Sequence, residues 1–153
     1  MRRSAAHHAL FEQMLADSRI CKIVLKRENR LIVCTSMLRA STTRAYTHKT
    51  YDQVCVTIRP ADLQRFNESY DDYYAWLDEN LVGQAVHRVS YEMLSAAPED
   101  SVAAACAFLG VGASVPRFKC FTRQSTSPLR DALVNFEKLR EAFAGTERAG
   151  DVE

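Results

Sequence analysis

The sequence predicts an α/β fold with a parallel sheet, from two apolar runs and the helical patterns around them. Ile20–Leu25 is short, β-branched and apolar, which is typical of a strand buried on both faces. Ala85–Tyr91 is a second run of this kind. Strands that alternate with helices favour parallel pairing. Because a parallel sheet needs covered faces and neighbouring strands, two or three strands indicate part of a larger sheet whose first strands are missing.

Helical patterns precede, separate and follow these strands. Pro60 suits the first turn of a helix, since its missing N–H costs nothing there, and the apolar residues of 60–80 recur at helical spacing. Val54, Val56 and Ile58 alternate as in a further strand. The expected helices cover 5–15, 28–41, 60–80, 98–109 and 128–143.

Length and composition describe one ordinary globular domain. The chain has 153 residues, 47% hydrophobic and 25% charged, and we expect a single domain over 1–153 with a loose tail over 146–153. A net charge of +1 gives little support to nucleic-acid binding. No run approaches the roughly 20 apolar residues of a membrane span. The cysteines form no CxxC pair, which favours reduced thiols and a cytoplasmic location.

The stretch after the first strand carries the chemistry. That strand ends in Lys26-Arg27, and a helix follows directly. Ligands of open α/β sheets gather beyond the carboxyl ends of the strands, and a helix N-terminus there favours an anion. Arg27 adds a forked, permanently charged donor, and Ser36 reaches the same anion from the side of the helix. Solvated charges at a strand end are an equally good interpretation of Lys26, Arg27 and Arg30.

Lys26–Leu31, together with Ser36 and Arg39-Ala40, resembles the 3′-phosphate motif of sulfotransferases that use 3′-phosphoadenylyl sulfate. The similarity is greatest to the bacterial carbohydrate and lipopolysaccharide sulfotransferases. In that motif a strand is followed by Arg, and Ser lies further on inside a helix. The resemblance implies that Arg27 and Ser36 bind the 3′-phosphate. Thr35 has the shorter of the two spacings found in the family, so the register stays open.

A second segment is similar to the family's YE-x-L … P … FLG run. It consists of Val89–Leu94, then Pro98, then Ala107–Val111. This run is mainly structural, because it describes a strand, a turn and a packing helix. The resemblance therefore implies that Tyr91 and Glu92 hold the fold rather than act in catalysis.

A third segment, Thr122–Asp131 followed by Asn135, resembles the loop and final helix that close over the nucleotide. Carried over, Arg123 is a second phosphate ligand, and Gln124 and Ser125 lie near the nucleotide. A solvated loop arginine followed by a helix cap is an equally good interpretation. The three segments occur in family order over residues 20–143.

The resemblance implies a P-loop-like three-layer α/β sandwich, 3′-phosphoadenylyl sulfate as donor and adenosine 3′,5′-bisphosphate as product. It implies a carbohydrate or glycolipid hydroxyl as acceptor. The family also has a Gly-containing loop for the 5′-phosphosulfate, whereas the first glycine here is Gly83. The chain is then either the C-terminal portion of a longer enzyme or a non-catalytic remnant that keeps the fold, and both interpretations stay open.

His48 is the candidate catalytic base, since it follows the phosphate helix where the family places acceptor contacts, and His suits proton transfer near neutral pH. An ordinary surface histidine is the alternative. His7 and His8 face different ways on a helix, and no residue cluster has metal spacing, so we expect no metal. A helix-rich interaction domain without a nucleotide is a third class of function. An exposed sheet edge would also favour self-association.

Overall fold

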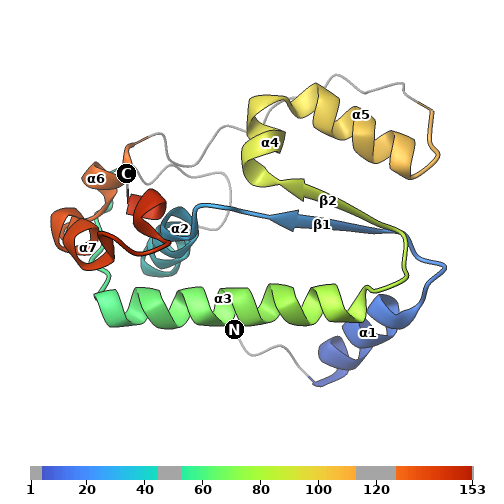
Figure 1. The fold of residues 1–153 in the computed structure, drawn as a ribbon, viewed down its shortest axis with the longest axis horizontal. Helices are drawn as coiled ribbons and strands as arrows, with labels where there is room; N and C mark the ends of the chain where they lie inside the picture. Colours follow the sequence, from blue (N-terminus) through green and yellow to red (C-terminus); the bar gives the residue numbers. More distant parts are fainter. Residues whose placement is uncertain (1–4, 45–52, 113–126, 153) are drawn as a thin grey trace. The chain divides into compact units, whose positions relative to one another are not determined.

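The computed structural model describes residues 5–44, 53–112 and 127–152 (Figure 1). They fall into two compact units. The strand unit comprises described residues 5–28 and 71–112, and the helical unit comprises 29–44, 53–70 and 127–152. The long helix α3 (Pro60–Asn80) belongs to both, because its first half lies in the helical unit and its second half in the strand unit.

The strand unit contains a two-stranded parallel sheet of β1 (Lys22–Lys26) and β2 (Val86–Ser90), as Figure 1 shows. The strands pair in register from Lys22 opposite Val86 to Lys26 opposite Ser90. The predicted α/β class and the parallel pairing of these two strands are therefore confirmed. Helix α3 has the bounds that the apolar spacing predicted.

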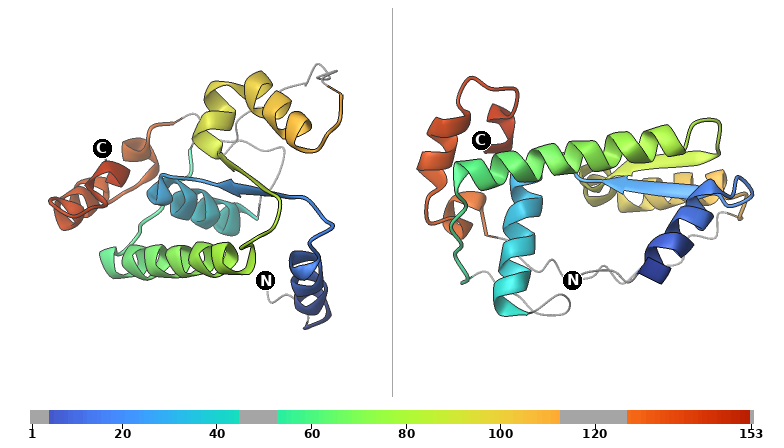
Figure 2. Two further views of the ribbon diagram at one scale, coloured as in Figure 1. Left: turned by 45° about the vertical axis from the view of Figure 1, so that its right-hand side comes forward. Right: turned by 90° about the horizontal axis from the view of Figure 1, so that it is seen from below.

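Helices cover both faces of this sheet. On one face, Val24 and Val86 pack with buried leucines of α1 (Ala5–Ala16), of α3 and of the turn after it: Leu15, Leu77 and Leu81. On the other face, His87 stacks on Phe108 of α5 (Pro98–Phe108), with ring centres 5.5 Å apart. Figures 1 and 2 show α5 and the second half of α3 on opposite sides of the strands.

The expectation that β1 is buried on both faces is wrong for two of its side chains, and its outer edge has no neighbouring strand among the described residues. Ile23 and Leu25 are 45% and 48% exposed. The N–H of Lys22 donates to Ala85 O, so in a parallel pair the backbone groups of Ile23 and Leu25 point away from β2. Tyr74 of α3 donates its hydroxyl to Leu25 O at 2.9 Å. The edge is thus covered in part by a side chain of α3.

The helical unit is built around one apolar cluster. It combines α2 (Arg30–Thr43), the first half of α3, and three short helices: α6 (Leu129–Ala132), α7 (Phe136–Phe143) and the 3₁₀ helix η1 (Ala149–Val152). Its buried members come from α2, α3, α7, η1 and the segments before α3 and after α6, and are Leu31, Cys34, Val56, Ile58, Leu63, Leu133, Leu139 and Val152. The expected loose tail is corrected over η1, where Val152 is only 2% exposed.

The expected helix over 128–143 is also wrong, because the chain breaks between α6 and α7. Leu133 is extended and forms a parallel bridge with Val56. In this bridge Val56 N–H donates to Ala132 O and Val134 N–H donates to Val56 O, both at 3.0 Å. These bonds use backbone groups that a continuous helix would need. The predicted strand over 54–58 is limited to this bridge.

Candidate functional site at the carboxyl end of strand β1

The carboxyl ends of β1 and β2 meet because the strands are parallel. Lys26 pairs with Ser90, so the next residues, Arg27 and Tyr91, leave the sheet side by side. Ser90 ends β2 and caps α4 (Tyr91–Ala96), a helix that the sequence analysis missed. The Ser90 hydroxyl accepts the N–H of Met93 at 3.1 Å. The Ser90 cap therefore places Tyr91 and Glu92 in the first turn of α4.

Arg27 contacts both Tyr91 and Glu92. Its guanidinium carbon lies 4.1 Å from the centre of the Tyr91 ring, and its Nε lies 3.8 Å from Glu92 Oε1. The other carboxylate oxygen of Glu92 accepts the N–H of Glu28 at 3.1 Å. The Arg27 side chain is 27% exposed, so the cation is half-buried but within reach of a solute. A partly exposed pair of this kind contributes little to the free energy of unfolding.

Lys26, the other cation at this strand end, lies over the ring of Tyr74, with Nζ 4.9 Å from the ring centre. Tyr74 therefore contacts both the backbone of Leu25 and the side chain of Lys26. Two aromatic rings thus accompany the two cations at the end of β1. A set of simply solvated charges does not describe this arrangement.

The start of α2 lies two residues later than expected, at Arg30 instead of Glu28. Asn29 is the cap, and its Oδ1 accepts the N–H of Ile32 at 2.9 Å. Its Nδ2 donates to Asp151 O at 3.2 Å. The N–H of Ile32 is therefore already paired with this cap. Arg30 is 5% exposed and lies over the ring of Tyr70.

Ser36 and Thr35 lie on different sides of α2. Ser36 is half-buried, whereas Thr35 is 3% exposed and its hydroxyl oxygen has no hydrogen-bond partner among the described residues. A ligand reaches an accessible hydroxyl more easily than a buried one. Arg27 belongs to the strand unit and Ser36 to the helical unit.

A buried arginine that the sequence analysis used only as part of the resemblance joins α2 to two other segments. Arg39 is 2% exposed, its Nε donates to Val54 O at 2.6 Å, and its terminal nitrogens lie 3.4 Å from Ser127 Oγ. The sequence signal that could have revealed Arg39 is its position on the buried side of α2, which it shares with Thr35 and Ala40.

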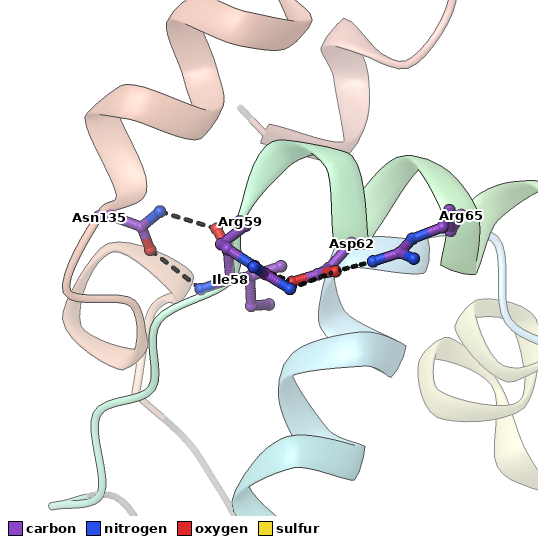
Figure 3. Close-up of polar contacts among 5 residues, drawn as sticks. All are labelled: Ile58, Arg59, Asp62, Arg65 and Asn135. Carbon is purple, nitrogen blue, oxygen red and sulfur yellow. Dashed lines mark hydrogen bonds and ion pairs between the residues drawn. The ribbon is translucent and has the colours of Figure 1, made fainter.

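Asn135 anchors the segment before α3, as Figure 3 shows. Its Oδ1 accepts the N–H of Ile58 at 3.1 Å, and its Nδ2 donates to Ile58 O at 2.8 Å. In the first turn of α3, Asp62 accepts hydrogen bonds from Arg59 and Arg65. The Asn135 contacts join the start of α7 to the segment before α3, whereas the Asp62 contacts are local and exposed.

Four predicted site residues, His48, Arg123, Gln124 and Ser125, lie outside the described residues. Within the described ranges no group of three or more His, Cys, Asp and Glu residues is arranged to hold a metal ion. In the same part of the chain no helix combines the length and apolar character needed to cross a membrane.

Comparison with known proteins assigns the class. The model of the sulfotransferase family matches residues 6–114, which is most of the chain and runs from α1 to just beyond α5. The chain therefore belongs to the sulfotransferase family. The match includes Arg27, Ser36, Tyr91 and Glu92, while residues 123–125 lie beyond it. No curated protein and no solved structure matches the chain.

Proposed function

We propose that the chain binds 3′-phosphoadenylyl sulfate and transfers its sulfo group to a hydroxyl of a carbohydrate or glycolipid. The observation that supports this most directly is the position of Arg27. It is a permanent cation at the carboxyl end of a parallel strand, held by the Tyr91 ring and the Glu92 carboxylate. Membership of the sulfotransferase family supports sulfo transfer as the reaction class.

The residues of this chain fit the 3′-phosphate of the nucleotide. A phosphate dianion takes charge-assisted hydrogen bonds from a guanidinium, and the planar fork of arginine matches two phosphate oxygens. We assign Arg27 as the principal ligand and Ser36 as a hydroxyl donor. By resemblance, Arg123, Gln124 and Ser125 are further nucleotide contacts.

In the proposed reaction the acceptor oxygen attacks sulfur while the bond from sulfur to the bridging oxygen of the donor breaks. The electron pair of that bond leaves with adenosine 3′,5′-bisphosphate, and a base takes the acceptor proton. We assign His48 to this proton transfer, since imidazole is the natural base near neutral pH. The carbohydrate or glycolipid acceptor follows from the resemblance to bacterial enzymes of that kind.

Calorimetry with two nucleotides tests the nucleotide site. Losing a hydrogen bond to a charged group costs about 1.5–3 kcal/mol, so Arg27→Ala should weaken binding of adenosine 3′,5′-bisphosphate about 10- to 150-fold. Adenosine 5′-monophosphate lacks the 3′-phosphate and should be almost indifferent to the change. Arg88→Ala is the matched control, since Arg88 is an exposed cation of β2 paired with Asp78. Equal binding of both nucleotides, or an Arg27→Ala variant with unchanged affinity, would show that the 3′-phosphate assignment is wrong.

A transfer assay with 3′-phosphoadenylyl sulfate and carbohydrate acceptors separates the enzyme from a binding module. Transfer that Arg27→Ala diminishes supports the enzyme. Binding of the bisphosphate without transfer to any acceptor supports a module that keeps the fold and the nucleotide site only. His48→Ala should lower the transfer rate while leaving the affinity for the bisphosphate unchanged.

A further inference from the structure

We infer that Tyr91 and Glu92 are positioning residues that fix the Arg27 guanidinium for its phosphate. This inference rests on the proposed function of Arg27. The sequence assigned the Tyr91-Glu92 pair only to the fold. The contacts at the end of β1 indicate a second role for this pair. Tyr91 and Glu92 both contact the Arg27 side chain, and Glu92 also accepts the backbone N–H of Glu28.

Each residue restrains a different freedom of Arg27. The Tyr91 ring lies 4.1 Å from the guanidinium carbon and provides a surface for the face of the planar group. The Glu92 carboxylate lies 3.8 Å from Nε and attracts one edge of the same group. A guanidinium is planar and rigid, so fixing one face and one edge fixes the directions of all its N–H groups.

Glu92 is itself restrained by contacts on both sides. Its Oε2 accepts the N–H of Glu28, the residue directly after Arg27, at 3.1 Å. Its backbone lies in the first turn of α4, which Ser90 caps. The position of the Glu92 carboxylate is therefore fixed by α4 and by Glu28, and it does not depend on the conformation of the Arg27 side chain. An arginine side chain loses rotamer entropy when it binds a ligand, so restraining it beforehand favours binding.

Because Glu92 is negatively charged, the direction in which its removal changes the affinity for phosphate distinguishes two roles. A carboxylate close to a bound dianion repels it, so a purely electrostatic role would make removal of the charge strengthen binding. Positioning predicts the opposite result. Glu92→Gln keeps an amide oxygen that can accept the Glu28 N–H but removes the charge that attracts Arg27.

The test is calorimetry with adenosine 3′,5′-bisphosphate on single variants and on the same variants combined with Arg27→Ala. Tyr91→Phe keeps the ring and should bind within about twofold of the unchanged protein, whereas Tyr91→Leu should bind about 2- to 10-fold more weakly. Glu92→Gln and Glu92→Ala should each bind about 2- to 5-fold more weakly. In the Arg27→Ala background none of these changes should weaken binding further, because the group that they orient is gone.

A merely structural role gives different results. It predicts that the Tyr91 and Glu92 variants lose the same affinity for the bisphosphate with Arg27 and with Arg27→Ala. It also predicts that they lose affinity for adenosine 5′-monophosphate. Either result overturns the inference. Tighter binding by Glu92→Gln overturns it too. If Tyr91→Leu does not fold, the two Glu92 variants still decide the question, since this side chain is 37% exposed. If Arg27→Ala alone leaves affinity unchanged, the proposed function is wrong; if Arg27→Ala weakens binding and the positioning variants do not, only this inference is wrong.

Discussion

The guanidinium carbon of Arg27 lies 4.1 Å from the centre of the Tyr91 ring, although the two residues belong to sequence segments on either side of α3. One residue follows β1 and the other follows β2. Parallel pairing of Lys26 with Ser90 brings the two chain ends together. The segment that resembles the family's 3′-phosphate motif and the segment that resembles its YE run thus meet at the carboxyl end of the two strands.

Ser36→Ala should weaken binding of adenosine 3′,5′-bisphosphate by up to about tenfold, because a hydroxyl donor to a charged phosphate is removed. Thr35→Val should leave binding unchanged and leave stability unchanged or slightly raised, since it removes a buried hydroxyl that has no partner among the described residues. Calorimetry and urea unfolding measure both effects. Weakened binding by Thr35→Val, with Ser36→Ala unaffected, would place the motif at the shorter spacing.

Asn135→Ala should lower the free energy of unfolding by about 1–3 kcal/mol, because it leaves the N–H and C=O of Ile58 unpaired. Ile58 is 2% exposed, so water cannot easily replace the lost partners. Urea unfolding measures the loss. Asn80→Ala is the matched control, since the Asn80 amide donates to Trp76 O at an exposed position. Equal stability of the two variants would contradict the prediction.

Asp62 should make the stability depend on pH. Hydrogen bonds from Arg59 and then Arg65 hold the pKa of Asp62 below its ordinary value of 3.8. Since the unfolded chain has the ordinary pKa, the contribution is fully present above about pH 3.8 and is lost as the pH falls through the lowered folded-state value. Asp62→Asn should therefore be less stable than the unchanged protein at pH 7, and the difference should shrink in acid.

Unfolding followed by circular dichroism from neutral to acidic pH checks this prediction. The control is Asp72→Asn, an exposed position of the same helix α3. A stability difference for Asp62→Asn that stays constant from pH 7 into the acid range would refute the role of the carboxylate charge.

Cysteine reactivity should follow burial. Burial raises the pKa of the Cys34 thiol, and the charge of Asp62 raises it further, so little reactive thiolate is present. Cys21 and Cys55 are exposed. Iodoacetamide should therefore modify Cys21 and Cys55 well before Cys34, as measured by mass spectrometry of peptides over time. In urea the three rates should converge, and a Cys34 rate equal to the others without urea would argue against the buried position.

The outer edge of β1 should favour self-association, because Ile23 and Leu25 are exposed and their backbone groups point away from β2. Sedimentation velocity should show association that rises with concentration, and Ile23→Lys should reduce it. Val82→Lys is the control, since Val82 is 80% exposed outside the strands. A protein that stays monomeric at high concentration would contradict this prediction.

Local patterns were sufficient for several parts of the fold. The apolar run over Ile20–Leu25, the second run before Tyr91 and the helical spacing of 60–80 predicted β1, β2 and α3, because strand and helix periods are properties of neighbouring residues. A cation directly after a strand is also visible in the chain itself, and the resemblance to the family singled out Arg27 among Lys26, Arg27 and Arg30.

The sequence by itself determined the two parallel strands, the long helix and the cation at a strand end. The tertiary structure alone decided the rest, because it depends on contacts between distant segments. The bridge of Leu133 with Val56 broke a helix that local propensity favoured. The register of β1 on β2 placed Tyr91 and Glu92 against Arg27. The periodicity and charge of a segment can be found in its own sequence. The distant groups that bond its backbone or contact its side chains are determined only when the segments pack.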